Sequence, residues 1–374
     1  MKVQFNKKQA QKVFAILGDF YQNQKGIFNG VILSQDQWPS PLDPVARANW
    51  IFAISLFMRG KAITDDQFQW FWELYQNYPE IFEPAILAEK WTPQLILEAL
   101  KSLAPKVLKS KPIGNGLGAL SQQIEERLAH LYQNFLILNS QWGGNVLNLF
   151  KGIRNFEEAF SRADYKQNPF GFWGMRRKIF SLFTLWLQDR GLLSDFPAPL
   201  PADFHALRIL LATGIVKIIN AKALAFNKLY PALEGKKAVK VGDSFVDVIM
   251  LWSQKFLAAS GFSPRVIHPA MWILSRELCS LHLQNTTREK ARVFFDEKIV
   301  RKNSALWPKN YRDPCFVCPI EEFCGGAVPS APYYRWGLLV RFERIEYPFK
   351  KSRQSVLPGL DESMIFRGAK GRRK

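Results

Sequence analysis

Three of the four cysteines in this sequence, Cys315, Cys318 and Cys324, lie within ten residues of one another, and the fourth, Cys279, lies upstream. Thiolates this close repel one another unless a cation binds them, so the spacing indicates a metal site. Disulfides, a zinc ion with four thiolate ligands and an iron–sulfur cluster are the three interpretations. Zinc sites usually pair two short CxxC knuckles, whereas a single CxxC is followed here by a five-residue gap. This pattern favours a [4Fe–4S] cluster, with zinc as the alternative.

A basic glycine turn lies about a hundred residues before Cys279. It consists of Gly174, Arg176, Arg177 and Lys178, and an apolar helix is expected at Ile179–Leu187. A turn that enters a helix leaves backbone N–H groups unpaired at the positive end of the helix dipole. Such a turn can hold a phosphate, and it can equally be a solvated basic cap on an ordinary helix.

A possible catalytic carboxylate follows, at Asp203. It occupies the position of an N-cap before an apolar helix, in the run Asp203-Phe-His205-Ala-Leu-Arg208. As a cap alone, Asp203 needs no further function. The order of the parts favours a function beyond capping: a basic turn is followed by a helix, a capping aspartate, a second helix and a cysteine cluster.

These parts resemble the iron–sulfur branch of the helix-hairpin-helix DNA glycosylase superfamily, typified by endonuclease III and the adenine-mismatch glycosylase. That family has a glycine hairpin, then D-x-H-x-x-R, then cysteines spaced C-x6-C-x2-C-x5-C. Asp203, His205 and Arg208 match the second motif at each fixed position, and the last three cysteines keep the last two gaps. The resemblance covers roughly residues 121–326.

The resemblance implies a role for each matching residue. It implies an N-glycosylase that excises a damaged or modified base in base-excision repair, with Asp203 as the catalytic carboxylate and Lys178 as a Schiff-base nucleophile for lyase activity. It implies a [4Fe–4S] cluster on Cys279, Cys315, Cys318 and Cys324. The residues expected to contact nucleic acid are Gly174, Arg176, Arg177, His205 and Arg208.

The sequence departs from the family pattern at two places. Arg176 stands where the hairpin has its second glycine. Between Cys279 and Cys315 lie 35 residues where the family has six, and an inserted helix is expected around Thr286–Lys302. A surface insertion can leave the ligands together, because a long loop costs little more closure entropy than a short one.

A second resemblance is to the queuosine-nucleotide N-glycosylase family, which is related to the first but typically lacks the cluster. It rests on Arg127 to Phe160 with the turn Trp142–Asn145, and on the segments Phe172–Trp186 and Ala202–Phe204. Both resemblances imply cleavage of an N-glycosidic bond, but they differ in substrate: duplex DNA or a modified nucleotide. The cluster favours DNA.

The charge of the chain supports a polyanionic partner. Lysine and arginine number 51 against 32 acidic residues, a formal charge of +19. Neutralising phosphates releases counterions, which favours binding. No apolar run reaches the length that spans a bilayer, and no targeting segment is apparent. We therefore expect a cytoplasmic protein without membrane contact. We also expect a monomer.

Hydrophobic periodicity predicts an all-α chain with a two-lobed helical fold like that of the helix-hairpin-helix glycosylases and a C-terminal iron–sulfur loop. The expected helices lie mostly within residues 1–30 and at Val45–Met58, Asp65–Tyr78, Ser121–Leu138 and Val146–Phe150. The expected divisions are an N-terminal helical region (1–120), a glycosylase-like core (121–270), a cluster region with the inserted helix (271–330) and a basic C-terminal tail (331–374).

Two non-enzymatic alternatives stay open. The chain could be a nucleic-acid-binding protein on the same scaffold, with Asp203 only a helix cap. Alternatively, the basic tail, which ends in Arg367-Gly-Ala-Lys-Gly-Arg-Arg-Lys374, could bind phosphates while the rest serves as a protein–protein module.

Overall fold

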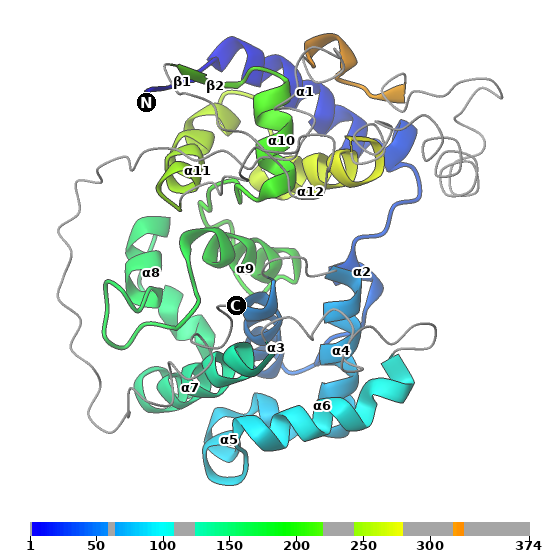
Figure 1. Ribbon diagram of the computed structural model, residues 1–374. Coiled ribbons are helices and arrows are strands. Elements are labelled where there is room, and N and C mark those ends of the chain that lie inside the picture. Colours follow the sequence, from blue (N-terminus) through cyan, green and yellow to red (C-terminus); the bar gives the residue numbers. More distant parts are fainter. Residues whose placement is uncertain (1, 59–63, 108–123, 220–242, 280–316, 325–374) are drawn as a thin grey trace, which may run out of the picture. The chain divides into compact units, whose positions relative to one another are not determined.

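The computed structural model describes residues 2–58, 64–107, 124–219, 243–279 and 317–324, and Figure 1 shows their helices and strands. These residues are mostly helical, which confirms the predicted helical class. The structure adds one antiparallel pair of short strands, β1 (Lys2–Phe5) and β2 (Val216–Ile219), in which Phe5 pairs with Val216. Strands of four residues are too short to give a clear alternating pattern, which is why the sequence did not reveal them.

The described chain forms two compact units. Unit 1 combines the residues up to Val31 with those from Pro199 onward, and unit 2 comprises Ile32–Ala198. This division differs from the predicted boundaries after residues 120 and 270, because the first helix of the chain belongs with elements that come much later. The inserted segment around Thr286–Lys302, Cys315 and the tail from residue 331 lie outside the described residues.

Unit 1 places the N-terminal helix α1 against the helices that follow Asp203. The apolar face of α1 is buried through Ala10, Val13, Phe14 and Leu17, and the helix packs on α11 and α12. The spacing of these residues by three and four is that of one helix face. The helical elements of unit 1 are α1 (Lys7–Gln22), η1 (Gly26–Phe28), α10 (Phe204–Ala212), α11 (Asp243–Leu257), α12 (Pro264–Leu274), the π-helical segment η6 (Ser275–Cys279) and η9 (Glu321–Phe323).

Unit 2 is built around α3 (Pro44–Phe57), which is buried on every side from Ala48 to Phe57. A helix that is apolar all round must be covered all round, and α4, α7 and α9 pack against α3 (Figure 1). The other helical elements of unit 2 are α2 (Ser34–Gln37), α4 (Thr64–Asn77), η2 (Pro79–Phe82), α5 (Pro84–Lys90), α6 (Pro93–Val107), α7 (Ile124–Trp142), η4 (Val146–Phe150), α8 (Phe156–Ala163) and α9 (Arg177–Asp189).

The predicted helices of unit 2 are confirmed with ends that shift by a few residues. The caps explain where two of them begin. Asp43 accepts a hydrogen bond from the backbone N–H of Ala46 at the start of α3 (2.7 Å), and Thr92 accepts one from that of Leu95 at the start of α6 (3.2 Å). In α4, predicted as the helix Asp65–Tyr78, Phe68 and Phe71 share one helix face and are fully buried in the core.

One polar side chain is buried inside this apolar unit and fixes a remote turn. The Asn49 amide of α3 donates to the carbonyl oxygens of Gly144 (2.8 Å) and Phe82 (3.4 Å), and its oxygen accepts from the N–H of Val146 (3.2 Å). Gly143 and Gly144 both have positive φ, 60° and 73°, which residues with a Cβ rarely adopt. Asn49 therefore pairs backbone groups that this glycine turn leaves inside the core.

None of the described helices is both long enough and apolar enough to cross a lipid bilayer.

Replacing Asn49 by leucine is expected to lower the free energy of unfolding of unit 2 by about 2–4 kcal/mol. The side chain has a similar volume, but three backbone groups lose their partner, two of them in the buried residues Phe82 and Val146, and each costs roughly 1 kcal/mol or more. The matched control is Asn77→Leu at an exposed helix end. It removes the hydrogen bond from the Asn77 side-chain amide to the carbonyl of Glu73 and should change the free energy of unfolding by at most about 0.5 kcal/mol. Chemical denaturation of both variants gives the comparison, and equal losses would contradict the role given to Asn49.

Candidate functional site

Asp203 caps α10, as its position in the sequence predicts. Its Oδ1 atom accepts a hydrogen bond from the backbone N–H of Ala206 at 2.7 Å. The apolar run after it forms α10, and Ala206, Leu207, Ile209 and Leu210 are buried. The cap holds one carboxylate oxygen at the positive end of the helix.

The other carboxylate oxygen of Asp203 faces a histidine of α12. The Oδ2 atom lies 3.4 Å from Nε2 of His268, and the two side chains are 23% and 12% exposed. Burial alone would raise the pKa of Asp203. The hydrogen bond with His268, the charges of His268 and His205, and the N–H of Ala206 outweigh that effect and hold this pKa well below its usual range. Asp203 is therefore an ionised carboxylate that solvent still reaches.

The other two motif residues, His205 and Arg208, both bind Ser275, the first residue of η6. The Nδ1 atom of His205 lies 3.0 Å from the hydroxyl of Ser275. The guanidinium of Arg208 donates to that hydroxyl (3.0 Å) and to the Ser275 carbonyl (3.1 Å). All three motif positions thus connect α10 to α12 and η6.

His205 and Arg208 were predicted to contact nucleic acid, and in the structure their described partners lie within unit 1. Burial lowers the pKa of His205 to about 4, although the charge of Asp203 acts in the opposite direction, so His205 is neutral at pH 7 and offers no cation to a phosphate. Arg208 is only 5% exposed and binds Ser275 inside unit 1. Both residues hold the site together.

Three of the four cysteines lie in described segments of unit 1, at the end of η6 and around η9. Cys279 is the last residue of η6, while Cys318 and Cys324 lie on either side of η9, and no disulfide joins these three described cysteines. Burial raises the pKa of Cys279 to about 12. The charge of Arg208 opposes this rise, and the charge of Cys324 adds to it. Burial and the charges of Cys279 and Cys324 likewise raise the pKa of Cys318. The sulfur atoms are near enough for their charges to interact.

This donor set fits a thiolate-bound metal group in its chemistry. The predicted fourth ligand, Cys315, lies outside the described residues, and within the described ranges no group of three or more His, Cys, Asp or Glu side chains is placed to hold a metal ion. The high pKa of Cys279 means that a metal would have to displace its proton. Arg208 is the cation whose charge favours the thiolate there.

The basic glycine turn lies in unit 2 and begins α9. Gly174 is buried with φ +80°, and Arg176 is the N-cap residue, partly exposed at the start of the helix. Lys178 lies in the first turn of α9 and is partly buried. Arg177 is different, because it is only 6% exposed, forms an ion pair with Glu157 and stacks over Phe160 at 4.5 Å. Arg177, which was predicted to contact nucleic acid, thus has its described partners, Glu157 and Phe160, within unit 2.

Two residues of the site were missed by the sequence analysis: His268 and Ser275. His268 is 65 residues after Asp203 and Ser275 is 70 after His205, so no local spacing connects them. Ser275 begins a π-helical segment, a feature that often marks a functional position but has no simple sequence pattern.

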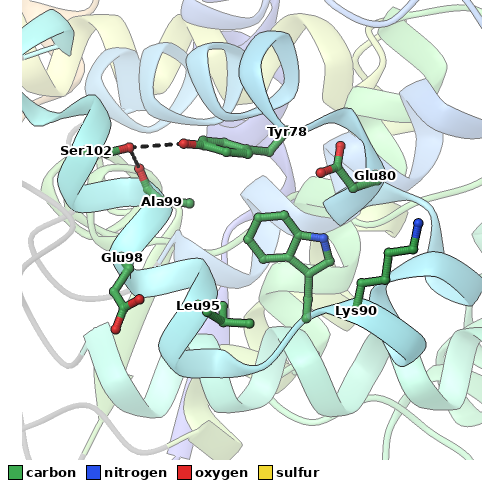
Figure 2. Close-up of a pocket in the computed structure, with 8 residues that line it drawn as sticks. Tyr78, Glu80, Lys90, Leu95, Glu98, Ala99 and Ser102 are labelled. Carbon is green, nitrogen blue, oxygen red and sulfur yellow. Dashed lines mark hydrogen bonds between the residues drawn. The ribbon is translucent and has the colours of Figure 1, made fainter.

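A separate hollow of about 430 Å³ lies in unit 2, and Figure 2 shows seven of its eight lining residues labelled. The hydroxyls of Tyr78 and Ser102 are 3.3 Å apart in its wall. The rings of Tyr78 and Trp91 meet nearly at right angles (78°), 5.6 Å between centroids. Glu80 and Glu98 also line the hollow. None of the predicted site residues belongs to it.

Removing the Arg177 side chain is expected to destabilise unit 2, whereas removing that of Arg176 is not. Arg177→Ala loses the ion pair with Glu157 and the contact with Phe160, at a cost of roughly 1–3 kcal/mol. Arg176→Ala removes the same charge at a partly exposed position and should cost less than about 1 kcal/mol. Denaturant titration of the two variants tests this, and the division of roles would be wrong if Arg176→Ala proved the more damaging change.

Comparison with known proteins assigns no family to this chain. No family model matches it, and a search of curated proteins found no match either. The resemblance to the helix-hairpin-helix glycosylases therefore rests on the motif residues themselves.

Proposed function

We propose that this protein is an N-glycosylase that hydrolyses the bond between a damaged or modified base and its sugar in DNA. The observation that carries the proposal is the state of Asp203: an ionised carboxylate, 23% exposed, held by the N–H of Ala206 and by His268. A structural cap needs only the first of these two partners.

The role that suits Asp203 is electrostatic. As the C–N bond breaks, the base leaves with the bonding electrons and positive charge develops on the sugar, which water then attacks. A fixed negative charge beside the sugar stabilises that state without reorganisation. A carboxylate whose pKa lies far below neutrality is a weak base, so stabilising the cation fits Asp203 better than taking a proton from water.

His268 acts in this proposal as a positioning residue. Its Nε2 atom faces Oδ2 of Asp203, while the N–H of Ala206 holds Oδ1. With both oxygens engaged, the carboxylate keeps one orientation, and orientation contributes to the rate because reacting groups must meet in a defined geometry.

In this proposal the basic turn of unit 2 contacts phosphate through Arg176, which is partly exposed at the start of α9. Lys178 is the candidate amine for a Schiff base with the sugar, which would add strand-nicking lyase activity. The formal charge of +19 supports a nucleic acid as substrate over a single modified nucleotide, since long-range attraction scales with the number of phosphates.

A [4Fe–4S] cluster would be held by Cys279, Cys315, Cys318 and Cys324, with zinc as the alternative. When bound, the group supplies metal–thiolate bonds that tie η6 to the segment 317–324. Ser275 and Arg208 hold the other end of η6 against α10, the helix that Asp203 caps. The proposed role of the cysteines is thus to stabilise the support of Asp203.

The Asp203→Asn variant is expected to lose base release by at least about a hundredfold while it keeps its fold. The amide removes the negative charge but can still cap α10. Asp43→Asn is the matched control, because Asp43 caps α3 through a bond of the same 2.7 Å to the N–H of Ala46. Release assays on a panel of lesion-bearing duplexes and modified nucleotides compare the variants. Full activity of Asp203→Asn on a substrate of the wild type would show that Asp203 is only a cap.

Purified protein is expected to be brown, to absorb broadly in the blue and to contain about four iron atoms per chain. Cys324→Ser should lower both the iron content and the thermal stability of unit 1, because the metal bonds would hold η9 in place and η9 would unfold when they are lost. Elemental analysis and visible absorption provide the measurement. Colourless protein with one zinc per chain would replace the cluster with a zinc site.

A further inference from the structure

We propose that three stacked rings in unit 2, His130, Trp173 and Tyr165, form a platform for an unpaired nucleobase of a nucleic-acid strand. We call these three rings the aromatic column. The inference rests on the proposed function for its partner, a nucleic acid, and adds the element that would receive a base once it is unpaired.

The geometry of the aromatic column is that of a continuous stack. The rings of Trp173 and Tyr165 lie 4.5 Å apart with 16° between their planes, and those of His130 and Trp173 lie 6.1 Å apart with 24°. The guanidinium of Arg176 lies over Tyr165, 5.9 Å from its centroid. All four side chains are partly exposed. Near-parallel rings with a cation beside them are what base-stacking proteins present to single strands.

A buried amide holds the central ring in place. Asn134 of α7 is fully buried, and its side chain binds the backbone of Trp173 on both sides, accepting from the N–H at 2.6 Å and donating to the carbonyl at 2.8 Å. Asn49 likewise binds the backbone of the glycine turn through a buried amide, but Asn134 binds a residue whose own ring is partly exposed. Packing alone does not require so firm an anchor for an exposed ring.

The position of Tyr165 is fixed by a close backbone crossing. The N–H of Phe172 donates to the carbonyl of Ala163 at 2.7 Å. At Gly171 an added Cβ would come within 2.5 Å of the backbone of Asp164 and Tyr165, so only glycine fits. The aromatic column is therefore ordered before any ligand arrives, and the ordering cost of binding is small.

The step between His130 and Trp173 is the looser of the two and is where we place the base. Its centroids are 6.1 Å apart, against 4.5 Å for Trp173 and Tyr165, and the base would stack on the partly exposed rings there. Arg176 at the N-terminus of α9 supplies positive charge for the neighbouring phosphate. The acid next to Tyr165 in the chain, Asp164, accepts hydrogen bonds from the Lys166 N–H and from Gln167, which partly satisfies its charge.

The hollow of Figure 2 offers an internal comparison. It also carries a tyrosine and a tryptophan, but their rings meet at 78°, and the carboxylates of Glu80 and Glu98 line the same hollow. Edge-to-face rings beside negative charge do not suit a base with its phosphate. Trp91 is therefore the matched control for the aromatic column.

The test is a set of binding titrations with the full-length protein. The probes are a labelled single-stranded oligonucleotide of mixed sequence, a strand of equal length built of abasic nucleotides, and adenosine monophosphate. The variants are His130→Leu, Tyr165→Leu, Tyr165→Phe and the control Trp91→Leu. His130→Leu replaces the imidazole ring by a non-aromatic side chain on α7 and leaves the Asn134 anchor intact, so it reports on stacking even if Tyr165→Leu disturbs the turn.

The two leucine variants in the aromatic column should weaken binding of the base-containing strand about tenfold and leave the abasic strand unchanged, because stacking is lost and charge is not. Tyr165→Phe should bind like the wild type, and so should Trp91→Leu. Equal weakening for both strands, or no weakening for either, would overturn the proposal. Adenosine monophosphate binding as tightly as the strand would also overturn it, in favour of a free-nucleotide site.

The same titrations separate this inference from the proposed enzymatic function. Asp203→Asn is expected to bind the single strand as the wild type does. If no substrate in the panel released a base, the N-glycosylase proposal would fail while stacking-dependent binding could still be measured. If base release occurred without any difference between the two strands, the aromatic column would have no such role.

Discussion

The buried charge of Arg208 is the constraint on which the candidate site depends. A guanidinium taken out of water must be paired or hydrogen-bonded, and here it binds both the hydroxyl and the carbonyl of Ser275. That requirement fixes the junction of α12 and η6 against α10. His205 binds the same hydroxyl, so a single serine orders one turn of α10 on one side and the segment that ends at Cys279 on the other.

The same packing leaves Asp203 charged and His205 neutral, although it lowers the pKa of both side chains. Burial makes His205 neutral by lowering its pKa to about 4, while hydrogen bonds and neighbouring charges keep Asp203 ionised in spite of burial. Asp203 is thus the ionised carboxylate of this cluster, with His268 beside it. The motif thus contains one partly exposed carboxylate, Asp203, and two residues, His205 and Arg208, that bind Ser275.

In unit 2, two buried asparagine side chains each fix a distant turn of the backbone. Asn49 and Asn134 are both buried amides, and each binds the backbone of a segment distant in the sequence: the glycine turn at Gly144 and the aromatic turn at Trp173. Buried amides are costly unless fully paired, so each of them specifies one arrangement of the turn it holds. In the first case the result is a closed core. In the second it is an ordered set of partly exposed rings next to the basic N-terminus of α9.

The sequence by itself determined the helices and their caps, because both depend on residues a few positions apart: the stripe at Phe68 and Phe71, and the capping role of Asp203. It also identified the residues around which the site is built. Only the tertiary structure decided what surrounds them. The partners His268 and Ser275 lie 65 and 70 residues from the side chains they bind. Burial, which made Arg177 and Arg208 structural and His205 neutral, is a property of packing that no local pattern of charge reveals.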